Sequence, residues 1–279
     1  MHPKRVLIIG IGLIGGSLLK AIRKYFKETK VDAAVRQPQE YWDIKPYIHE
    51  LIDLKEPLPA LDWDLVFVCT PVHLIPQYVR AAAAVALPQA VISDVGSSKA
   101  WLDQELADIP NFIGSHPMAG KEKTGFQFSE AELFFGKTTV ICPREGGDES
   151  LSQRLSFFWE SVGSRVISKT AAEHDQIVAY TSHLPHVLSY LYSCLGETSG
   201  LDIAGIFGGS FKDFTRIGQS DPQLWQQIFE SNKKNIVNLI EKFIKFLYDF
   251  KDLIQVEDWQ SVKKIIIQSN DFLKNLENL

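Results

Sequence analysis

The sequence predicts an α/β protein in which a doubly wound domain of parallel strands precedes an all-helical domain. Its 279 residues, 45% of them hydrophobic, suffice for two modest cores. Short apolar runs alternate with helical stretches in the first half, whereas only long helical patterns follow Lys169. We therefore expect the first domain at residues 1–169 and the second at residues 170–279.

The strands of the first domain are indicated by apolar runs that are rich in Val and Ile and lack polar alternation, which is typical of strands buried on both faces. Helical stretches, among them one through Tyr25 and one through about Val85, separate the runs and favour a parallel sheet. The predicted strands cover residues 5–10, 30–35, 64–70, 90–95, 111–115, 138–143 and 165–169.

The helical domain contains two start signals. Thr170 and Glu173 have the capping-box spacing and open a helix that runs to about Gly196, and Pro222 suits the first position of a second helix that continues to about Phe250. Apolar side chains follow the helical period there and in the last segment. Because such wide apolar stripes need a second face, we expect a homodimer through this domain.

The composition favours small-molecule chemistry. The net charge is −5, the sequence pI is about 5.8, and lysines and arginines are scattered, so we expect no nucleic-acid partner and no membrane partner. The cysteines are an odd number, lie far apart and match no metal-ligand spacing, so we expect no metal site and buried thiols in a reducing cytoplasm. They are Cys69, Cys142 and Cys194.

A glycine motif, GIGLIG, lies between the first predicted strand and the first helix. Gly10, Gly12 and Gly15 permit the tight turn, the close approach of the backbone to a pyrophosphate, and the contact between helix and strand. Leu13 and Ile14 open the helix, whose N-terminus favours negative phosphates. In this strand–turn–helix context the motif predicts a Rossmann-like dinucleotide site.

The end of the second predicted strand bears on the choice of cofactor. An NAD site usually has Asp or Glu there to bind the ribose 2′-hydroxyl, but Asp32 lies too early and Arg36 follows the strand. Arg36 offers a fork of donors to a 2′-phosphate, which favours NADP over NAD unless it is an ordinary exposed arginine. Thr70 and Pro71, at the end of another strand, complete the expected cofactor residues.

Three stretches follow predicted strand ends and are expected to converge beside the nicotinamide, because substrates lie outside the carboxyl ends of such strands. They cover residues 69–71, 94–99 and 115–117. The last contains His116, whose imidazole can stay neutral at cellular pH and take a proton from a substrate hydroxyl as hydride leaves its carbon.

Four motifs follow the glycine turn: DVGSSK at 94–99, GSHPMAGKEKTG at 114–125, SHLPH at 182–186 and FKDFTRIGQSDPQLW at 211–225. Together the chain resembles, over nearly its whole length, the prephenate and arogenate dehydrogenases of tyrosine biosynthesis. The resemblance implies oxidative decarboxylation of a cyclohexadienol to 4-hydroxyphenylpyruvate or tyrosine. Hydride moves from the carbon that bears the ring hydroxyl to the nicotinamide, carbon dioxide leaves and the ring becomes aromatic.

The resemblance implies roles for several side chains. His116 corresponds to the histidine that deprotonates the ring hydroxyl, Ser97 to a serine that orients that hydroxyl or the histidine, and Arg216 to an arginine that pairs with a substrate carboxylate. Lys121 stands where the family often has threonine and favours the keto acid prephenate, whereas the following Glu122 can pair with the ammonium of arogenate or with Lys121. The choice between these substrates therefore stays open.

Four further residues lie in the matched helical motifs, and each has an alternative explanation. His183 and His186 lie three apart on one face of a helix that Pro185 is predicted to kink, so they either face the substrate or hydrogen-bond between helices. Lys212 lies four residues before the carboxylate-binding arginine and either shares its face or is solvated. Trp225 matches a tryptophan near the substrate or packs in the core.

Two rival functions remain. A β-hydroxyacid dehydrogenase shares the architecture but relies on a catalytic lysine for which the helical domain shows no matching context. A non-enzymatic NADP(H)-binding sensor would keep the fold without turnover. The remaining histidines, His174 among them, stand in no context that marks them for function.

Overall fold

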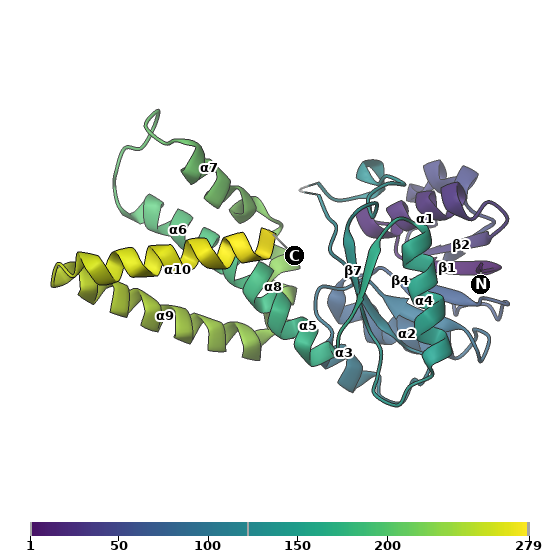
Figure 1. Ribbon diagram of the computed structural model, residues 1–279. Helices are drawn as coiled ribbons and strands as arrows, with labels where there is room; N and C mark the ends of the chain where they lie inside the picture. The colour runs from purple at the N-terminus through teal and green to yellow at the C-terminus, as the bar shows by residue number, and fades with distance from the viewer. Residues whose placement is uncertain (1, 122, 278–279) are drawn as a thin grey trace. The chain divides into compact units, whose positions relative to one another are not determined.

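The computed structural model describes residues 2–121 and 123–277, and its architecture confirms the predicted fold class (Figure 1). A five-stranded parallel sheet has the order β3-β2-β1-β4-β5. Its strands are β1 (Arg5–Ile9), β2 (Lys30–Val35), β3 (Glu50–Asp53), β4 (Leu65–Val68) and β5 (Val91–Asp94). The helices of this part are α1 (Leu13–Tyr25), α2 (Ile75–Ala83), α3 (Ala100–Glu105) and α4 (Glu149–Ser161).

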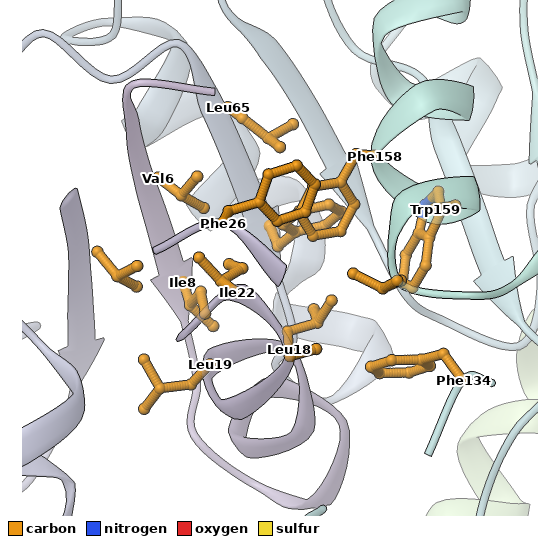
Figure 2. Packing of buried hydrophobic residues seen from close by; sticks show 14 of the residues in the cluster. Val6, Ile8, Leu18, Leu19, Ile22, Phe26, Leu65, Phe134, Phe158 and Trp159 are labelled. Carbon is orange, nitrogen blue, oxygen red and sulfur yellow. The ribbon is translucent and has the colours of Figure 1, made fainter. Parts of the chain in front are cut away.

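Strand β1 is buried on both faces of the sheet, as its uninterrupted apolar run predicts. Val6 and Ile8 belong to one hydrophobic cluster, which also holds side chains of α1 and α4 (Figure 2). Leu7 and Ile9 belong to a second cluster with side chains of α2 and α3. Because side chains alternate along a strand, helices must cover both faces of the sheet.

Aromatic rings close the cluster between β1, α1 and α4. Phe158 of α4 stacks on Phe26 with 5.4 Å between ring centroids and lies 4.8 Å from the ring of Phe67 on β4. Trp159 packs edge-on against Phe67 and Phe134. Burial of each such ring removes 150–250 Å² from water, roughly, and fixes α4 against the sheet.

A second, three-stranded sheet follows, with the order β6-β7-β8. Its strands are β6 (Gly114–Pro117), β7 (Thr138–Cys142) and β8 (Arg165–Ser168). The expectation that these runs extend the first sheet is wrong. A single parallel bridge joins Ile92 to Phe112, after which β6 pairs antiparallel with β7. An apolar run indicates a strand, but it does not indicate which neighbour the strand pairs with.

Strand β3 lies outside the predicted strands. Its sequence, ELID, is four residues long and acidic at both ends, so it carries little strand signal.

The helical part begins at the predicted capping box. The Thr170 hydroxyl accepts a hydrogen bond from the backbone N–H of Glu173, whose carboxylate accepts one from the Thr170 N–H. The predicted helix is continuous in three pieces: α5 (Ala171–Val178), a π-helical turn (Ala179–His183) and α6 (Leu184–Thr198). The wide turn ends at His183, two residues before Pro185, which has no N–H to donate.

The predicted extent of the second helix, from Pro222 to about Phe250, is wrong. The structure has two helices in this segment. They are α8 and α9, separated at Asn232, whose backbone leaves helical geometry with φ −121° and ψ 25°. The helices of this region are α7 (Gly209–Arg216), α8 (Pro222–Ser231), α9 (Lys233–Gln255) and α10 (Trp259–Glu277).

The chain divides into two compact units, Met1–Lys233 and Lys234–Leu279. The second unit is a helical hairpin of α9 and α10, whose connecting turn holds Glu257 at a φ of 56° (Figure 1). All of the described residues that the sequence marks for function lie in the first unit. Across residues 2–121 and 123–277, none of the helices combines the length and apolarity that crossing a bilayer requires.

Candidate active site

The turn between β1 and α1 requires glycine at two of its three motif positions. Gly10 has a φ of +92°, and a Cβ there would lie 2.9 Å from the backbone oxygen of Cys69. A Cβ on Gly15 would lie 2.0 Å from the backbone oxygen of Gly10. These contacts exclude any larger residue and hold the start of α1 against β1 and β4.

Gly12 differs, because a Cβ there would meet nothing within 4 Å. It is also the N-cap of α1, and its helix has no side-chain cap and no acidic residue in the first turn. The N–H groups of this turn are therefore available to an anion, and the helix dipole favours negative charge there. The open space at Gly12 fits the close approach of a pyrophosphate.

A cavity of about 220 Å³ lies at this turn. Its lining includes Gly10, Gly12, Arg36, Thr70 and Pro71. The expected cofactor residues Leu13, Ile14 and Gly15 belong to α1 and are not part of the lining. The hydroxyl of Thr70 is buried and has no hydrogen-bond partner in the described part of the chain. An unpaired buried hydroxyl at a cavity wall suits a polar ligand, so the residues fit a bound dinucleotide.

Where the cavity meets the end of β2, its lining has a cationic side chain and no acidic one. Asp32 lies within β2, buried, where it accepts hydrogen bonds from Arg5 Nε and Trp63 Nε1, both at 2.7 Å. Arg36 follows Val35 at the strand end and lines the cavity. Among the described residues the cavity lining contains no Asp or Glu.

His116 lies within β6, opposite Val140 of β7, rather than beyond a strand end as expected. It is half-buried, and its Nδ1 lies 2.9 Å from Nε2 of His174. Burial, together with the electrostatic effects of His174, Lys99 and His183, lowers the pKa of His116 well below its usual value. The imidazole is therefore neutral near pH 7 and can accept a proton.

His174 and Asp175, at the middle of α5, are the site residues that sequence reasoning missed. Both are buried, and His174 Nδ1 lies 2.8 Å from Asp175 Oδ1. The Asp175 carboxylate also accepts the backbone N–H groups of Lys99 and Ala100, at 2.7 and 2.9 Å. A His-Asp pair on the helix that follows a capping box was the only signal available in the sequence, and it is weak without the partner His116.

The loop that carries Ser97 is fixed from both sides. The Asp94 carboxylate accepts the Gly96 N–H at 2.8 Å and pairs with the buried ammonium of Lys99. The Ser98 hydroxyl donates to Ser231 Oγ on α8 at 2.8 Å. Ser97 itself is half-buried between these anchored neighbours.

Asp94 also joins this loop to the strand of His116. Its Oδ1 accepts the Ser115 N–H at 3.3 Å, and its backbone oxygen accepts the Ser115 hydroxyl at 2.6 Å. The structure therefore links the serine loop, the histidine strand and α5 in one network of hydrogen bonds.

His183 and His186 have different surroundings. His183 is buried, and its Nδ1 lies 3.2 Å from the amide nitrogen of Asn232. Burial lowers the pKa of His183 to about 4. His186 is half-buried, directs Nδ1 to the Ser182 carbonyl at 2.8 Å, and stacks on Trp225 with 3.6 Å between ring centroids. Burial lowers the pKa of His186 too, so both rings are neutral near pH 7.

The remaining candidates lie on two separate segments. Arg216 ends α7, and Lys212 lies one turn earlier on the same face, with its ammonium 5.4 Å from the centroid of the Phe207 ring. Lys121 pairs with Glu130 at 2.7 Å and donates to a backbone oxygen of its own loop. Glu122 lies outside the described residues. Lys121 is thus held by its own loop and takes no part in the network around His116.

Cys194 is exposed, contrary to the expected burial of all three thiols, whereas Cys142 is buried and Cys69 is half-buried. No group of His, Cys, Asp and Glu in the described part of the chain has the arrangement of a metal site.

Two family profiles match the chain. One, described as "Prephenate dehydrogenase, nucleotide-binding domain", covers residues 51–168, and the other, "Prephenate dehydrogenase, dimerization domain", covers residues 170–268. The chain belongs to the prephenate/arogenate dehydrogenase family. It is an NAD(P)-dependent oxidoreductase with cyclohexadienyl dehydrogenase activity.

Similar proteins align with this dehydrogenase over nearly its whole length. A cyclohexadienyl dehydrogenase of Zymomonas mobilis is 31% identical over 91% of this chain and 90% of its own. The structure of the A. aeolicus prephenate dehydrogenase in complex with hydroxyphenyl propionate and NAD+ has a TM-score of 0.87 at 30% identity, over 96% of this chain and 98% of its own. The arogenate dehydrogenase of Synechocystis has a TM-score of 0.82 at 26% identity, over 95% of this chain and 97% of its own.

The dehydrogenase shares only its fold with more distant enzymes. A 3-hydroxyisobutyrate dehydrogenase from Salmonella typhimurium has a TM-score of 0.57 at 13% identity, over 86% of this chain and 88% of its own. The Rossmann-plus-helical architecture therefore does not by itself select the substrate.

The two kinds of glycine in the turn predict two different mutant phenotypes. Gly12→Ala changes the free energy of unfolding by less than about 1 kcal/mol, because the new methyl meets no protein atom. It lowers NAD(P)+ affinity by about tenfold or more, because the methyl occupies the space for the pyrophosphate.

Gly10→Ala is the matched control and destabilises the protein by about 2 kcal/mol or more, since it combines a positive φ with a backbone clash. Urea unfolding and calorimetric titration with the nucleotide measure both quantities. Unchanged affinity in Gly12→Ala would place the pyrophosphate elsewhere.

Proposed function

We propose that this dehydrogenase oxidises and decarboxylates prephenate, arogenate or both, giving 4-hydroxyphenylpyruvate or tyrosine. The observation that carries the proposal is His116, a half-buried neutral imidazole whose Nδ1 is occupied by His174. The relatives named as cyclohexadienyl, prephenate and arogenate dehydrogenases support it. The glycine turn supports the redox half of the reaction.

The proton of the ring hydroxyl passes to His116 as the C–H bond at the same carbon breaks. When bound, the nicotinamide supplies a hydride acceptor. A positioned imidazole contributes roughly 10²- to 10⁴-fold to such a step. Because its surroundings lower its pKa, His116 is in the accepting form without first losing a proton of its own. Ser97, anchored on both sides, orients the hydroxyl or the imidazole.

We assign the binding of the substrate's carboxylate and ring to side chains of the helices. Arg216 pairs with a carboxylate, for which a planar guanidinium offers two parallel donors. His186 and Trp225, stacked on one another, form the wall against the ring, and the buried His183 supports them from behind. Lys212 adds positive charge beside Arg216.

The loop after His116 selects between the two substrates. Lys121 can reach the keto acid of prephenate only by leaving Glu130, with which it is paired. Its neighbour Glu122 would act on the ammonium of arogenate.

We assign NADP as the preferred cofactor. Arg36 lines the cavity at the end of β2, and the lining holds no carboxylate to accept a ribose 2′-hydroxyl. Asp32 lies within β2 and already accepts hydrogen bonds from Arg5 and Trp63 on its Oδ2. A guanidinium in this position suits a 2′-phosphate.

We further propose that the protein is a cytoplasmic homodimer joined through its helical part. The "dimerization domain" profile over residues 170–268 supports the dimer. Burial raises the pKa of the Cys142 thiol to about 12 and also raises that of Cys69, which suits thiols that stay reduced.

Substitution of His116 tests its role in catalysis. His116→Asn lowers kcat by ~10² or more, because an amide does not take the proton, and leaves the Kd for NADP+ within about threefold. His49→Asn, before β3, is the control and leaves kcat unchanged. Steady-state kinetics and nucleotide titration are the measurements. Near-wild-type turnover in His116→Asn contradicts the assignment.

Initial rates test the cofactor assignment. The wild-type protein gives a higher kcat/KM with NADP+ than with NAD+, and Arg36→Ala lowers the NADP+ value about tenfold or more while the NAD+ value stays within about threefold. Arg80→Ala, which removes a surface pair with Asp108, is the matched control. Equal losses with both cofactors, or a wild-type preference for NAD+, would remove Arg36 from a 2′-phosphate site.

A further inference from the structure

Behind His116, a line of buried hydrogen bonds leads away from the substrate side. His116 Nδ1 meets Nε2 of His174 at 2.9 Å, and His174 Nδ1 meets Oδ1 of Asp175 at 2.8 Å. His174 and Asp175 are each 1% exposed. These two side chains come from α5, whereas His116 comes from β6, so the line joins the helical part to the strands.

The direction of each hydrogen bond in this line follows from the Asp175 carboxylate at its end. Asp175 accepts the backbone N–H groups of Lys99 and Ala100, which favours the ionised carboxylate. A carboxylate only accepts, so His174 Nδ1 carries the hydrogen and donates it. If Nδ1 carries the one hydrogen of the His174 ring, Nε2 is an acceptor and His116 Nδ1 is the donor. The lone pair of His116 therefore lies on Nε2.

Other charged and titratable groups around the line are already satisfied. Lys99 pairs with Asp94, and His183 is held by Asn232, whose amide also donates to the Asp175 backbone oxygen. Nε2 of His116 forms no hydrogen bond with any of the residues that the structure describes. That nitrogen is the one left to accept from a substrate hydroxyl.

We propose that Asp175 and His174 are positioning residues that hold His116 in the tautomer whose Nε2 accepts the substrate proton. This inference rests on the proposed function for the identity of the proton donor only. The tautomer itself is a property of the resting protein. A reversed line, with hydrogen on His116 Nε2, would present the substrate with a donor where the reaction needs an acceptor.

Nitrogen-15 NMR of the histidine-labelled protein tests the tautomer without any turnover. We expect wild-type His116, assigned by its loss in His116→Asn, to carry hydrogen on Nδ1 and none on Nε2 near pH 7. In Asp175→Asn an NH₂ group at the Oδ1 position donates to His174 Nδ1, while the amide oxygen at the Oδ2 position keeps the Ala100 N–H bond and the Lys99 N–H bond is lost, so both rings reverse. Hydrogen on Nε2 of wild-type His116 overturns the proposal, even if the variant does not fold.

Kinetics test whether the tautomer matters for the reaction. Asp175→Asn is expected to lower kcat by ~10² or more with KM within about threefold. His174→Gln, whose side-chain oxygen can still accept from His116 Nδ1, retains at least about a tenth of wild-type kcat, whereas His174→Leu falls as far as Asp175→Asn. Thr170→Ala, which removes the cap of the same helix, lowers Tm without lowering kcat.

Three outcomes contradict the proposal: Asp175→Asn with near-wild-type kcat, His174→Gln no better than His174→Leu, or Thr170→Ala as damaging as Asp175→Asn. Failure of the proposed function is separate and shows itself as wild-type protein that reduces no nicotinamide with prephenate or arogenate. In that case the NMR result still decides the tautomer.

Discussion

The hydrogen bond between His116 and His174 is the contact on which the arrangement of the active site depends. It joins a strand to a helix that begins more than fifty residues later, and it links the half-buried His116 to the buried His174. Buried imidazoles and carboxylates are costly unless every polar atom has a partner. Asp175 therefore needs the N–H groups at the start of α3, and this need docks α5 where the serine loop ends.

The two halves of the reaction are held by different physical means. At the nucleotide end, backbone geometry decides: Gly10 and Gly15 are fixed by close contacts, and Gly12 leaves the space empty. At the proton end, a network of side chains decides, from Asp94 through Lys99 to Asp175. The close contacts at Gly10 and Gly15 leave no room for a larger residue. The side-chain network depends instead on which atom donates each hydrogen bond and which atom accepts it.

Local signals explain what the sequence could predict. The glycine turn, the strand over 30–35 and the capping box at Thr170 depend on neighbours within a few residues, and each is present in the structure. The role of His174 depends on His116, 58 residues away, so no local pattern marked it. The break at Asn232 has the same cause, because its amide serves the Asp175 carbonyl and His183 rather than its own helix.

The coupling of oxidation to decarboxylation is the central claim, and the stoichiometry of carbon dioxide release tests it most directly. Wild-type protein with NADP+ and a carboxyl-labelled cyclohexadienol, prephenate or arogenate, is expected to release one carbon dioxide for each nicotinamide reduced, because aromatisation follows the loss of hydride. Reduction of nicotinamide without carbon dioxide release would indicate an ordinary hydroxyacid dehydrogenase. Nucleotide binding without any reduction would indicate a sensor, and either result would contradict the account.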